Sequence, residues 1–294
     1  MQDTLGNMRH GFVQIPGVRT HFVEAGWKHE KLAILLHGFP DFWFGWRHQI
    51  PFLCKHLHVI AIDQRGYNLT SKPKGVSRYH LDALVSDVKH LVESFGHEKC
   101  ILVGHDWGGA VSWEFARQHP AMIEKLCVLN CPPVQLLMQE QFKNVHQLLS
   151  SYYIYLFQIP ILPEFLLSKN GAVLLAKMLS SMIPGITRQE IKIYRKGLSV
   201  KGTIRSAINY YRSAFRQQVL AAISGNQSSE ISIHVPTSVI WGFGDTALQP
   251  NFTLRFRNIC KRRCSIHLVD AGHFVHQEKP SVVNDIMLRE LIEG

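Results

Sequence analysis

The chain lacks several features that mark other classes of protein. No apolar run approaches the roughly 18 residues that a membrane-spanning helix needs, although 46% of the 294 residues are hydrophobic. Glycine and proline number only 21 and 13, which excludes disordered and collagen-like classes. The N-terminal stretch MQDTLGNMRHGFVQI has no apolar signal-peptide region. These absences predict one large buried core, in a protein of the cytoplasm or of the cytoplasmic membrane surface.

Cysteine is scarce and is not arranged for metal binding. The six cysteines lie mostly in or beside apolar runs, which is typical of reduced core thiols. Cys260, Cys264 and His267 are the nearest approach to a ligand set, but a zinc site usually brings paired, closely spaced ligands. We therefore expect reduced thiols and no metal.

Acidic residues are outnumbered by basic ones. The chain has 32 Lys and Arg against 22 Asp and Glu, a formal net charge of +10. Such an excess suits either nucleic acid or an anionic membrane surface as a partner. The densest basic cluster, Lys261 to Arg263, is short and has no RNA-binding or helix-turn-helix pattern around it. We expect no nucleic-acid partner and at most a peripheral association with acidic membrane surfaces.

Apolar runs of strand length alternate with segments of helix length. Residues Val13–Gly26 alternate apolar and polar around a Pro-Gly turn, which predicts a hairpin. Leu81–Gly96 carries apolar residues at helical spacing. Short runs typical of buried strands begin at Leu32, His58, Cys100, Leu126, Thr237 and Ser265. Strands that are apolar on both faces, with helices between them, predict an α/β fold whose mostly parallel sheet is flanked by helices.

One long segment interrupts this alternation. Residues 133–227 are helix-like, rich in aromatic residues and Met, and show no obvious strand. A helical insertion in an α/β chain is most simply a cap over the carboxyl ends of the strands, where such sheets bind ligands. We predict a core of residues 1–132 and 228–294 and a cap (lid) of residues 133–227.

The stretch CILVGHDWGGAVSWEFARQH predicts a strand, a sharp turn and a helix in immediate succession. Gly104 and Gly108 leave room for a tight turn around Asp106. This context is typical of a nucleophile elbow. The turn presents residue 106 at a helix N-terminus, where backbone N–H groups favour an anion. The alternative is that Asp106 serves only as a helix N-cap.

Residues elsewhere in the chain complete a candidate catalytic set. Asp245 in WGFGDTAL and His273 in DAGHFVHQEKP each follow a predicted strand, and the order nucleophile, acid, base is the one this type of fold uses. Asp270 is an alternative acid, but it lies inside the predicted strand. The His-Gly turn in HGFP can place the N–H of Phe39 beside that of Trp107, which would form an oxyanion hole.

Motifs along nearly the whole chain resemble a single family. HGFP, DQRGY, GHDWGG, FQIPILPE, NYYR and AGHFVHQEKP together resemble the α/β-hydrolase-fold epoxide hydrolases, in particular the animal branch without an N-terminal phosphatase domain. The resemblance implies hydrolysis of a lipid or other small hydrophobic epoxide to a vicinal diol, with water and without a cofactor. It also implies that the cap residues Tyr153 and Tyr211 are proton donors, and that His37, Pro40 and Phe157 bind the substrate.

An aspartate on the elbow suits an alkyl carbon as the electrophile. Asp106 is ionised at neutral pH and would form an ester that can be hydrolysed, whereas a serine would form a stable ether. His273, oriented by Asp245, would then activate the water that cleaves the ester.

Two other functions stay open. A haloalkane dehalogenase shares the Asp nucleophile and Trp107, although such enzymes usually carry Asn or Trp where Phe39 stands. A noncatalytic ligand receptor on a hydrolase fold is the second alternative.

Overall fold

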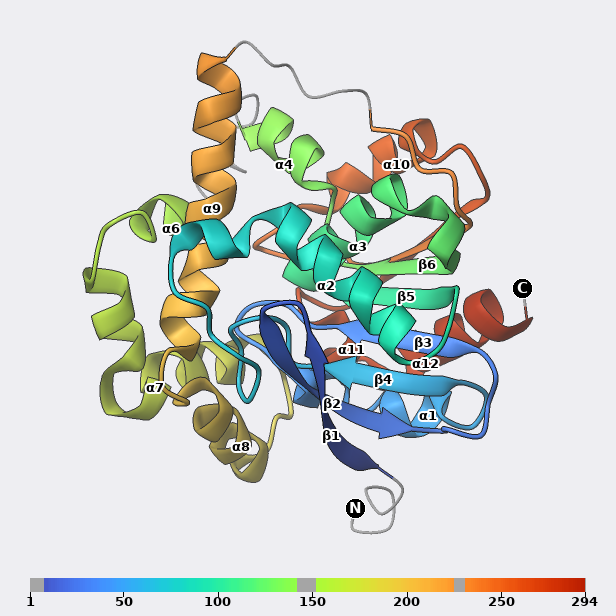
Figure 1. Cartoon of the computed structure of the whole chain (residues 1–294), viewed down its shortest axis with the longest axis horizontal. Helices are drawn as coiled ribbons and strands as arrows, with labels where there is room; N and C mark the ends of the chain where they lie inside the picture. The colour runs from blue at the N-terminus through green and yellow to red at the C-terminus, as the bar shows by residue number, and fades with distance from the viewer. Residues whose placement is uncertain (1–7, 142–151, 225–230, 294) are drawn as a thin grey trace.

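An eight-stranded sheet with the strand order β1-β2-β4-β3-β5-β6-β7-β8 forms the centre of the protein (Figure 1). The structure, a computed structural model, describes residues 8–141, 152–224 and 231–293. The hairpin strands β1 and β2 are antiparallel to each other and β2 is antiparallel to β4, whereas the other strands pair in parallel. The strands are β1 (Arg9–Ile15), β2 (Val18–Ala25), β3 (Leu32–Leu36), β4 (His58–Ile62), β5 (Cys100–His105), β6 (Ile123–Leu129), β7 (Thr237–Gly242) and β8 (Cys264–Val269). The predicted hairpin and mostly parallel sheet are confirmed.

Helices cover both faces of the sheet because its central strands are apolar on both sides. In β3, Ile34 and Leu36 enter one apolar cluster with α2 and α3, whereas Ala33 and Leu35 enter a second cluster with α1 and α12. The α-helices of the core are α1 (Ile50–Leu53), α2 (Leu81–Ser94), α3 (Trp107–Gln118), α10 (Thr253–Ile259), α11 (Val275–Glu278) and α12 (Pro280–Met287). Short 3₁₀ or π turns are η1 (Trp43–Trp46), η2 (Val76–Tyr79), η3 (Pro120–Met122), η4 (Pro250–Phe252) and η5 (Leu288–Glu293).

Where the structure describes it, the segment predicted as a cap consists of helices joined by short turns and contains no strand. It contains α4 (Val134–Gln141), α6 (Tyr152–Leu156), α7 (Leu162–Met182), α8 (Arg188–Leu198) and α9 (Thr203–Ile223). Helices α6 to α8 lie on the side of the molecule away from the C-terminus (Figure 1). The predicted boundary between residues 227 and 228 lies outside the described residues, so the division into core and cap stays a prediction.

A buried ion pair joins the cap to the core. Arg47, which follows η1, donates from Nε to Oε1 of Glu190 at 2.5 Å and from Nη1 to Oε1 of Gln277 at 2.6 Å. Glu190 also forms a capping box with Thr187 at the start of α8. Both charged side chains are buried, and a buried charge needs a partner to be tolerated. Arg47 therefore connects α8 to helix α11, which carries Gln277.

We expect Arg47→Met to lower the free energy of unfolding by about 3–5 kcal/mol, because the substitution leaves the buried Glu190 without its cation. Urea denaturation measures the change. Lys89→Met is the matched control, since it breaks an ion pair with Glu93 whose side chains are exposed, and it should change the stability little. Equal effects of the two substitutions would contradict a stabilising role for Arg47.

Candidate active site

The turn between β5 and α3 holds Asp106 in a backbone conformation that side chains rarely adopt. Its φ is 49° and its ψ is −120°, so the surrounding structure must enforce the turn. A Cβ on Gly104 would collide with the carbonyl oxygen of Gly108, and a Cβ on Gly108 would collide with that of Leu36. Glycine at these two positions is therefore what allows the strand, the turn and the helix to pack so closely.

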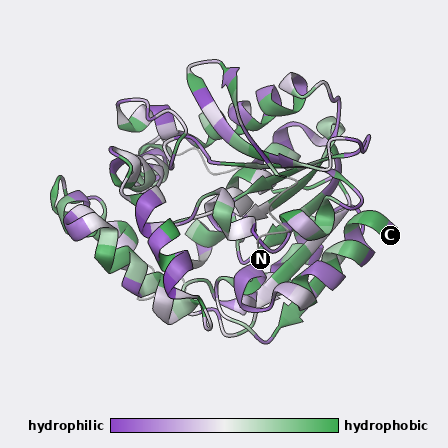
Figure 2. Cartoon of the chain, turned by 90° about the horizontal axis from the view of Figure 1, so that it is seen from below, coloured by the Kyte–Doolittle hydropathy of each residue, from purple (hydrophilic) through white to green (hydrophobic). Residues whose placement is uncertain are grey.

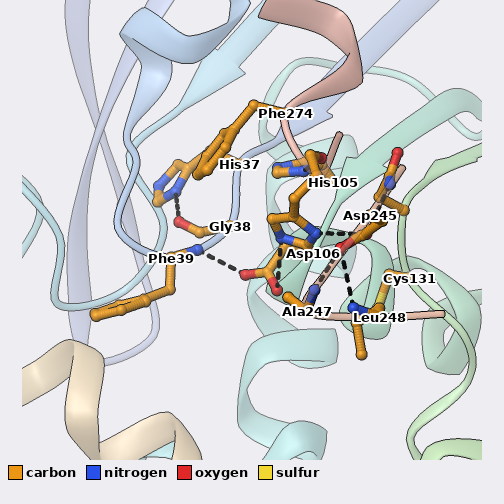
Figure 3. Close-up of polar contacts among 12 residues, drawn as sticks. His37, Gly38, Phe39, His105, Asp106, Cys131, Asp245, Ala247, Leu248 and Phe274 are labelled. Carbon is orange, nitrogen blue, oxygen red and sulfur yellow. Dashed lines mark hydrogen bonds and ion pairs between the residues drawn. The ribbon is translucent and has the colours of Figure 1, made fainter. Parts of the chain in front are cut away.

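The carboxylate of Asp106 points away from its own helix and toward two other segments (Figure 3). Its Oδ1 accepts a hydrogen bond of 2.7 Å from the backbone N–H of Phe39, in the loop after β3. Its Oδ2 lies 3.6 Å from Nε2 of His273. The side chain makes no capping hydrogen bond to α3. The alternative in which Asp106 is only an N-cap is therefore not supported.

His273 lies between the carboxylates of Asp106 and Asp245. Its Nδ1 is 2.8 Å from Oδ2 of Asp245, and Oδ1 of Asp245 accepts the N–H groups of Ala247 and Leu248 at 2.8 and 3.0 Å. Asp270, the alternative acid, is exposed just beyond β8. The structure thus brings together Asp106, His273 and Asp245 from three separate strand ends.

Asn130 belongs to this site, although the sequence analysis did not single it out. It follows β6 with a φ of 45°, a conformation that Asn tolerates better than most residues. Its Nδ2 donates to Oδ2 of Asp245 at 2.7 Å, and its Oδ1 accepts from the N–H of Gly242 at 3.2 Å. Asn130 therefore fixes the carboxylate of Asp245 relative to β7. The only signal in the sequence is an asparagine directly after an apolar strand run.

Opposite charges control the protonation states of Asp106 and His273. Burial alone would lower the pKa of His273, but the carboxylates of Asp245 and Asp106 reverse this effect and raise it to about 10. Burial alone would raise the pKa of Asp106, but the hydrogen bond and the charge of His273 lower it. The neighbouring His105 has a pKa lowered to about 4, chiefly by burial. At neutral pH an imidazolium therefore lies between two carboxylates, next to a neutral histidine.

Two phenols from the cap line the same cavity as Asp106 and His273. The rings of Tyr153 in α6 and Tyr211 in α9 are 5.7 Å apart, and the ring of Tyr211 is 5.1 Å from that of Trp107. Burial is the largest cause that raises the pKa of both phenols, and the negative charge of Asp106 adds to it. Both phenols therefore stay protonated at neutral pH.

Two cavities meet at Asp106, Tyr153 and Tyr211. The larger has a volume of about 650 Å³ and is also lined by His273, Phe39, Phe157 and many Leu, Ile and Met side chains of the cap. The smaller has a volume of about 50 Å³ and extends between Trp107 and apolar side chains such as Cys131, Val134 and Leu137. Space for a ligand therefore begins directly at the carboxylate.

Two residues expected to contact substrate do not line either cavity. His37 is fully buried, its Nδ1 bonds to the carbonyl of Gly38 and its Nε2 accepts the N–H of Gln64. Both ring nitrogens are thus occupied by the backbone, and the imidazole points away from Asp106 (Figure 3). Pro40 is buried after a cis peptide bond. Of the three predicted substrate contacts, only Phe157 lines the larger cavity.

Other features bear on ligands and membranes. Within the described ranges, no group of three or more His, Cys, Asp or Glu side chains could hold a metal ion. The same ranges contain no helix that is both long and apolar enough to span a bilayer. All six cysteines are free thiols.

Comparison with known proteins identifies the family. Residues 32–280 match the family model of the alpha/beta hydrolase fold. Epoxide hydrolase 3 of Mus musculus is 35% identical over 280 residues, which cover 94% of this chain and 74% of the relative. This chain belongs to the epoxide hydrolase family. It therefore has the α/β-hydrolase fold and is a hydrolase, as its motifs predicted.

Further relatives extend this result. Epoxide hydrolase 4 of Homo sapiens is 33% identical over 288 residues, or 95% of this chain and 77% of the relative. The crystal structure of a mutant epoxide hydrolase from Bacillus megaterium, in complex with its naphthyloxy-propane-1,2-diol product, has a TM-score of 0.86 at 31% identity. That comparison covers 96% of this chain and 99% of the other.

The charge of Asp106 should account for part of the high pKa of His273. Asp106→Asn removes one of the two facing carboxylates, so we expect the pKa of His273 to fall from about 10 by about 1–3. An NMR titration of the imidazole measures it. Asp270→Asn is the matched control, because this aspartate is exposed beyond β8, and it should leave the titration unchanged. An unaltered pKa in Asp106→Asn would show that the two side chains are not coupled.

Proposed function

We propose that the protein hydrolyses epoxides to vicinal diols through a covalent ester on Asp106. The observation that carries the proposal is a carboxylate on an elbow turn, 3.6 Å from Nε2 of His273, in a cavity that two cap phenols also line. The family of the chain and the diol bound to the Bacillus megaterium relative support the same reaction class.

In the first step, Asp106 attacks a carbon of the epoxide ring. Its Oδ1 is held by the N–H of Phe39, which leaves Oδ2 as the oxygen that forms the new C–O bond. The C–O bond of the ring breaks, and its oxygen takes a proton from Tyr153 or Tyr211. The raised pKa of both phenols keeps that proton available. A haloalkane dehalogenation would not need these donors, because halide leaves as an anion.

In the second step, the ester itself converts His273 into a base. Esterification removes the charge of Asp106, which is one of the two carboxylates that raise the pKa of the imidazole. The imidazolium then gives up its proton more easily, and this proton restores the phenol that was deprotonated in the first step, while Asp245 still orients the ring. His273 can now deprotonate a water that attacks the acyl carbon. The N–H groups of Phe39 and Trp107 would stabilise the oxyanion. When the ester C–O bond breaks, the departing diol oxygen takes the proton that His273 removed from water, and the carboxylic acid formed at Asp106 returns its proton to His273.

The two cavities favour an unsymmetrical hydrophobic substrate. A volume of about 650 Å³ suits a long acyl chain or an aryl group, whereas about 50 Å³ leaves room for only a small substituent. Their apolar lining favours lipid or other hydrophobic epoxides. We propose that the larger substituent occupies the cavity under α6 and α7, with the epoxide carbons at Asp106.

A single turnover in oxygen-18 water, with enzyme in excess over epoxide, tests the ester. If Asp106 supplies the attacking oxygen, the diol should be mostly unlabelled and the label should enter the peptide that contains Asp106. Mass spectrometry of both products measures this. Labelled diol from the first turnover, with an unlabelled peptide, would mean direct attack by water and would refute the covalent route.

Replacing the phenols should slow the opening of the ring. We expect Tyr153→Phe and Tyr211→Phe together to lower kcat by roughly 10²–10⁴-fold, because a positioned proton donor contributes about that much. Tyr155→Phe is the matched control, since Tyr155 lies in the same helix as Tyr153 but lines neither cavity. Epoxide turnover close to wild type in the double variant would exclude the two phenols as donors.

A further inference from the structure

The mouth of the larger cavity is an exposed apolar surface. Leu156, Leu162 and Leu166 line the cavity and are nevertheless 48, 49 and 48% exposed. Ile161 and Phe165 lie among them in sequence, do not line the cavity, and are 78 and 60% exposed. We call these five residues of α6, α7 and the turn between them the mouth surface. Contiguous exposed apolar surface of this kind is typical of a docking site.

The cap also carries most of the net positive charge of the protein. Residues 152–224 contain ten Lys and Arg but only two Glu, an excess of eight within a net charge of +10. Both acidic residues are already paired, Glu164 with Arg212 and Glu190 with Arg47. Nine of the ten basic residues are exposed. The segment that carries the mouth surface is therefore strongly cationic.

Helix α8 concentrates this charge on one face. Arg188, Lys192, Arg195 and Lys196 recur at helical spacing and are exposed, whereas Tyr194 on the opposite face is buried in the apolar cluster of the cap. Such a helix has one apolar and one cationic side.

The cationic face of α8 lies next to the apolar helix α7. Arg195 donates from Nη2 to the carbonyl of Asn170 at 2.8 Å and from Nε to that of Gly171 at 3.1 Å, at the kink in α7. Lys169 and Lys177 add exposed charges on α7 itself. In Figure 2, the helices on the side away from the C-terminus carry both hydrophobic and hydrophilic segments.

We propose that the mouth surface docks on an anionic lipid bilayer. Apolar side chains would enter the boundary between headgroups and acyl chains, and the surrounding cations would contact lipid phosphates. A second copy of the chain does not fit this surface, because two caps with an excess of eight positive charges each would repel one another. The passage of a hydrophobic epoxide from the bilayer into the cavity rests on the proposed function, whereas the docking does not.

Co-sedimentation of the full chain with lipid vesicles tests the docking without any turnover. We expect binding to vesicles that contain about a third phosphatidylserine, little binding to pure phosphatidylcholine, and weaker binding as salt is added. Equal binding to both vesicle types, or binding to neither, would overturn the proposal. Because no reaction is measured, a failure here leaves the proposed function untouched, and an inactive enzyme leaves the docking untouched.

A charge-reversal pair tests the cationic face. Lys192→Glu with Lys196→Glu should weaken binding to the anionic vesicles by roughly fivefold or more for each residue. The matched control is Lys28→Glu with Lys99→Glu, which makes the same change of charge at exposed positions of the core. Equal losses in the two pairs would mean that only total charge matters, and would contradict a specific docking face.

A second pair tests the apolar contribution. Ile161→Ser with Phe165→Ser should weaken vesicle binding by roughly tenfold or more, whereas Leu254→Ser with Leu268→Ser, which are 79 and 56% exposed on the core, should not. Thermal unfolding checks that each variant is folded. If the variant with Ile161→Ser and Phe165→Ser does not fold, the result for the charge-reversal pair decides whether the proposal holds. Sedimentation velocity without lipid tests the alternative occupant of the mouth surface, a second copy of the chain. A dimer of the wild type that the Ile161 and Phe165 substitutions dissociate would replace the bilayer by a second copy.

Discussion

The negative charge of Asp106, held among buried groups, is the constraint on which the rest of the site depends. Such a charge is tolerated only if other groups compensate it. The N–H of Phe39 and the imidazole of His273 do so, and both come from chain segments far from residue 106. They can meet because the carboxyl ends of parallel strands lie along one edge of the sheet. Gly104 and Gly108 remove the side chains that would prevent this approach.

Charge balance also links the two steps of the proposed reaction. Asp245 is fixed by the N–H groups of Ala247 and Leu248 and by the amide of Asn130, so it holds His273 in place whether or not Asp106 is charged. The charge of Asp106 is the part that changes, because esterification neutralises it. In the proposed reaction, the imidazolium is thus the ion-pair partner of the free carboxylate, and it would become a base only when there is an ester to cleave.

The sequence predicts those parts of this arrangement that depend on local patterns. Apolar runs gave the strands, and the elbow motif with the order of acidic residue and histidine gave Asp106, Asp245 and His273. Asn130 could not be predicted in the same way, because its partners lie more than 100 residues away in the sequence. The orientation of His37 could not be predicted, because a motif shows which residues occupy a loop but not where a side chain points, and here the backbone occupies both ring nitrogens.

The cap must satisfy two demands that conflict. Under the proposed function, it has to bury the phenols of Tyr153 and Tyr211 and enclose an apolar substrate, yet it must leave an opening through which that substrate enters. Such an opening necessarily exposes apolar side chains to water, which is unfavourable unless something covers them. The distribution of charge indicates what covers these side chains. Residues outside 152–224 include 22 basic and 20 acidic residues, so they are nearly neutral together, whereas the cap is strongly cationic. A cationic cap with an apolar opening is complementary to an anionic bilayer, the phase in which a hydrophobic epoxide would also be concentrated.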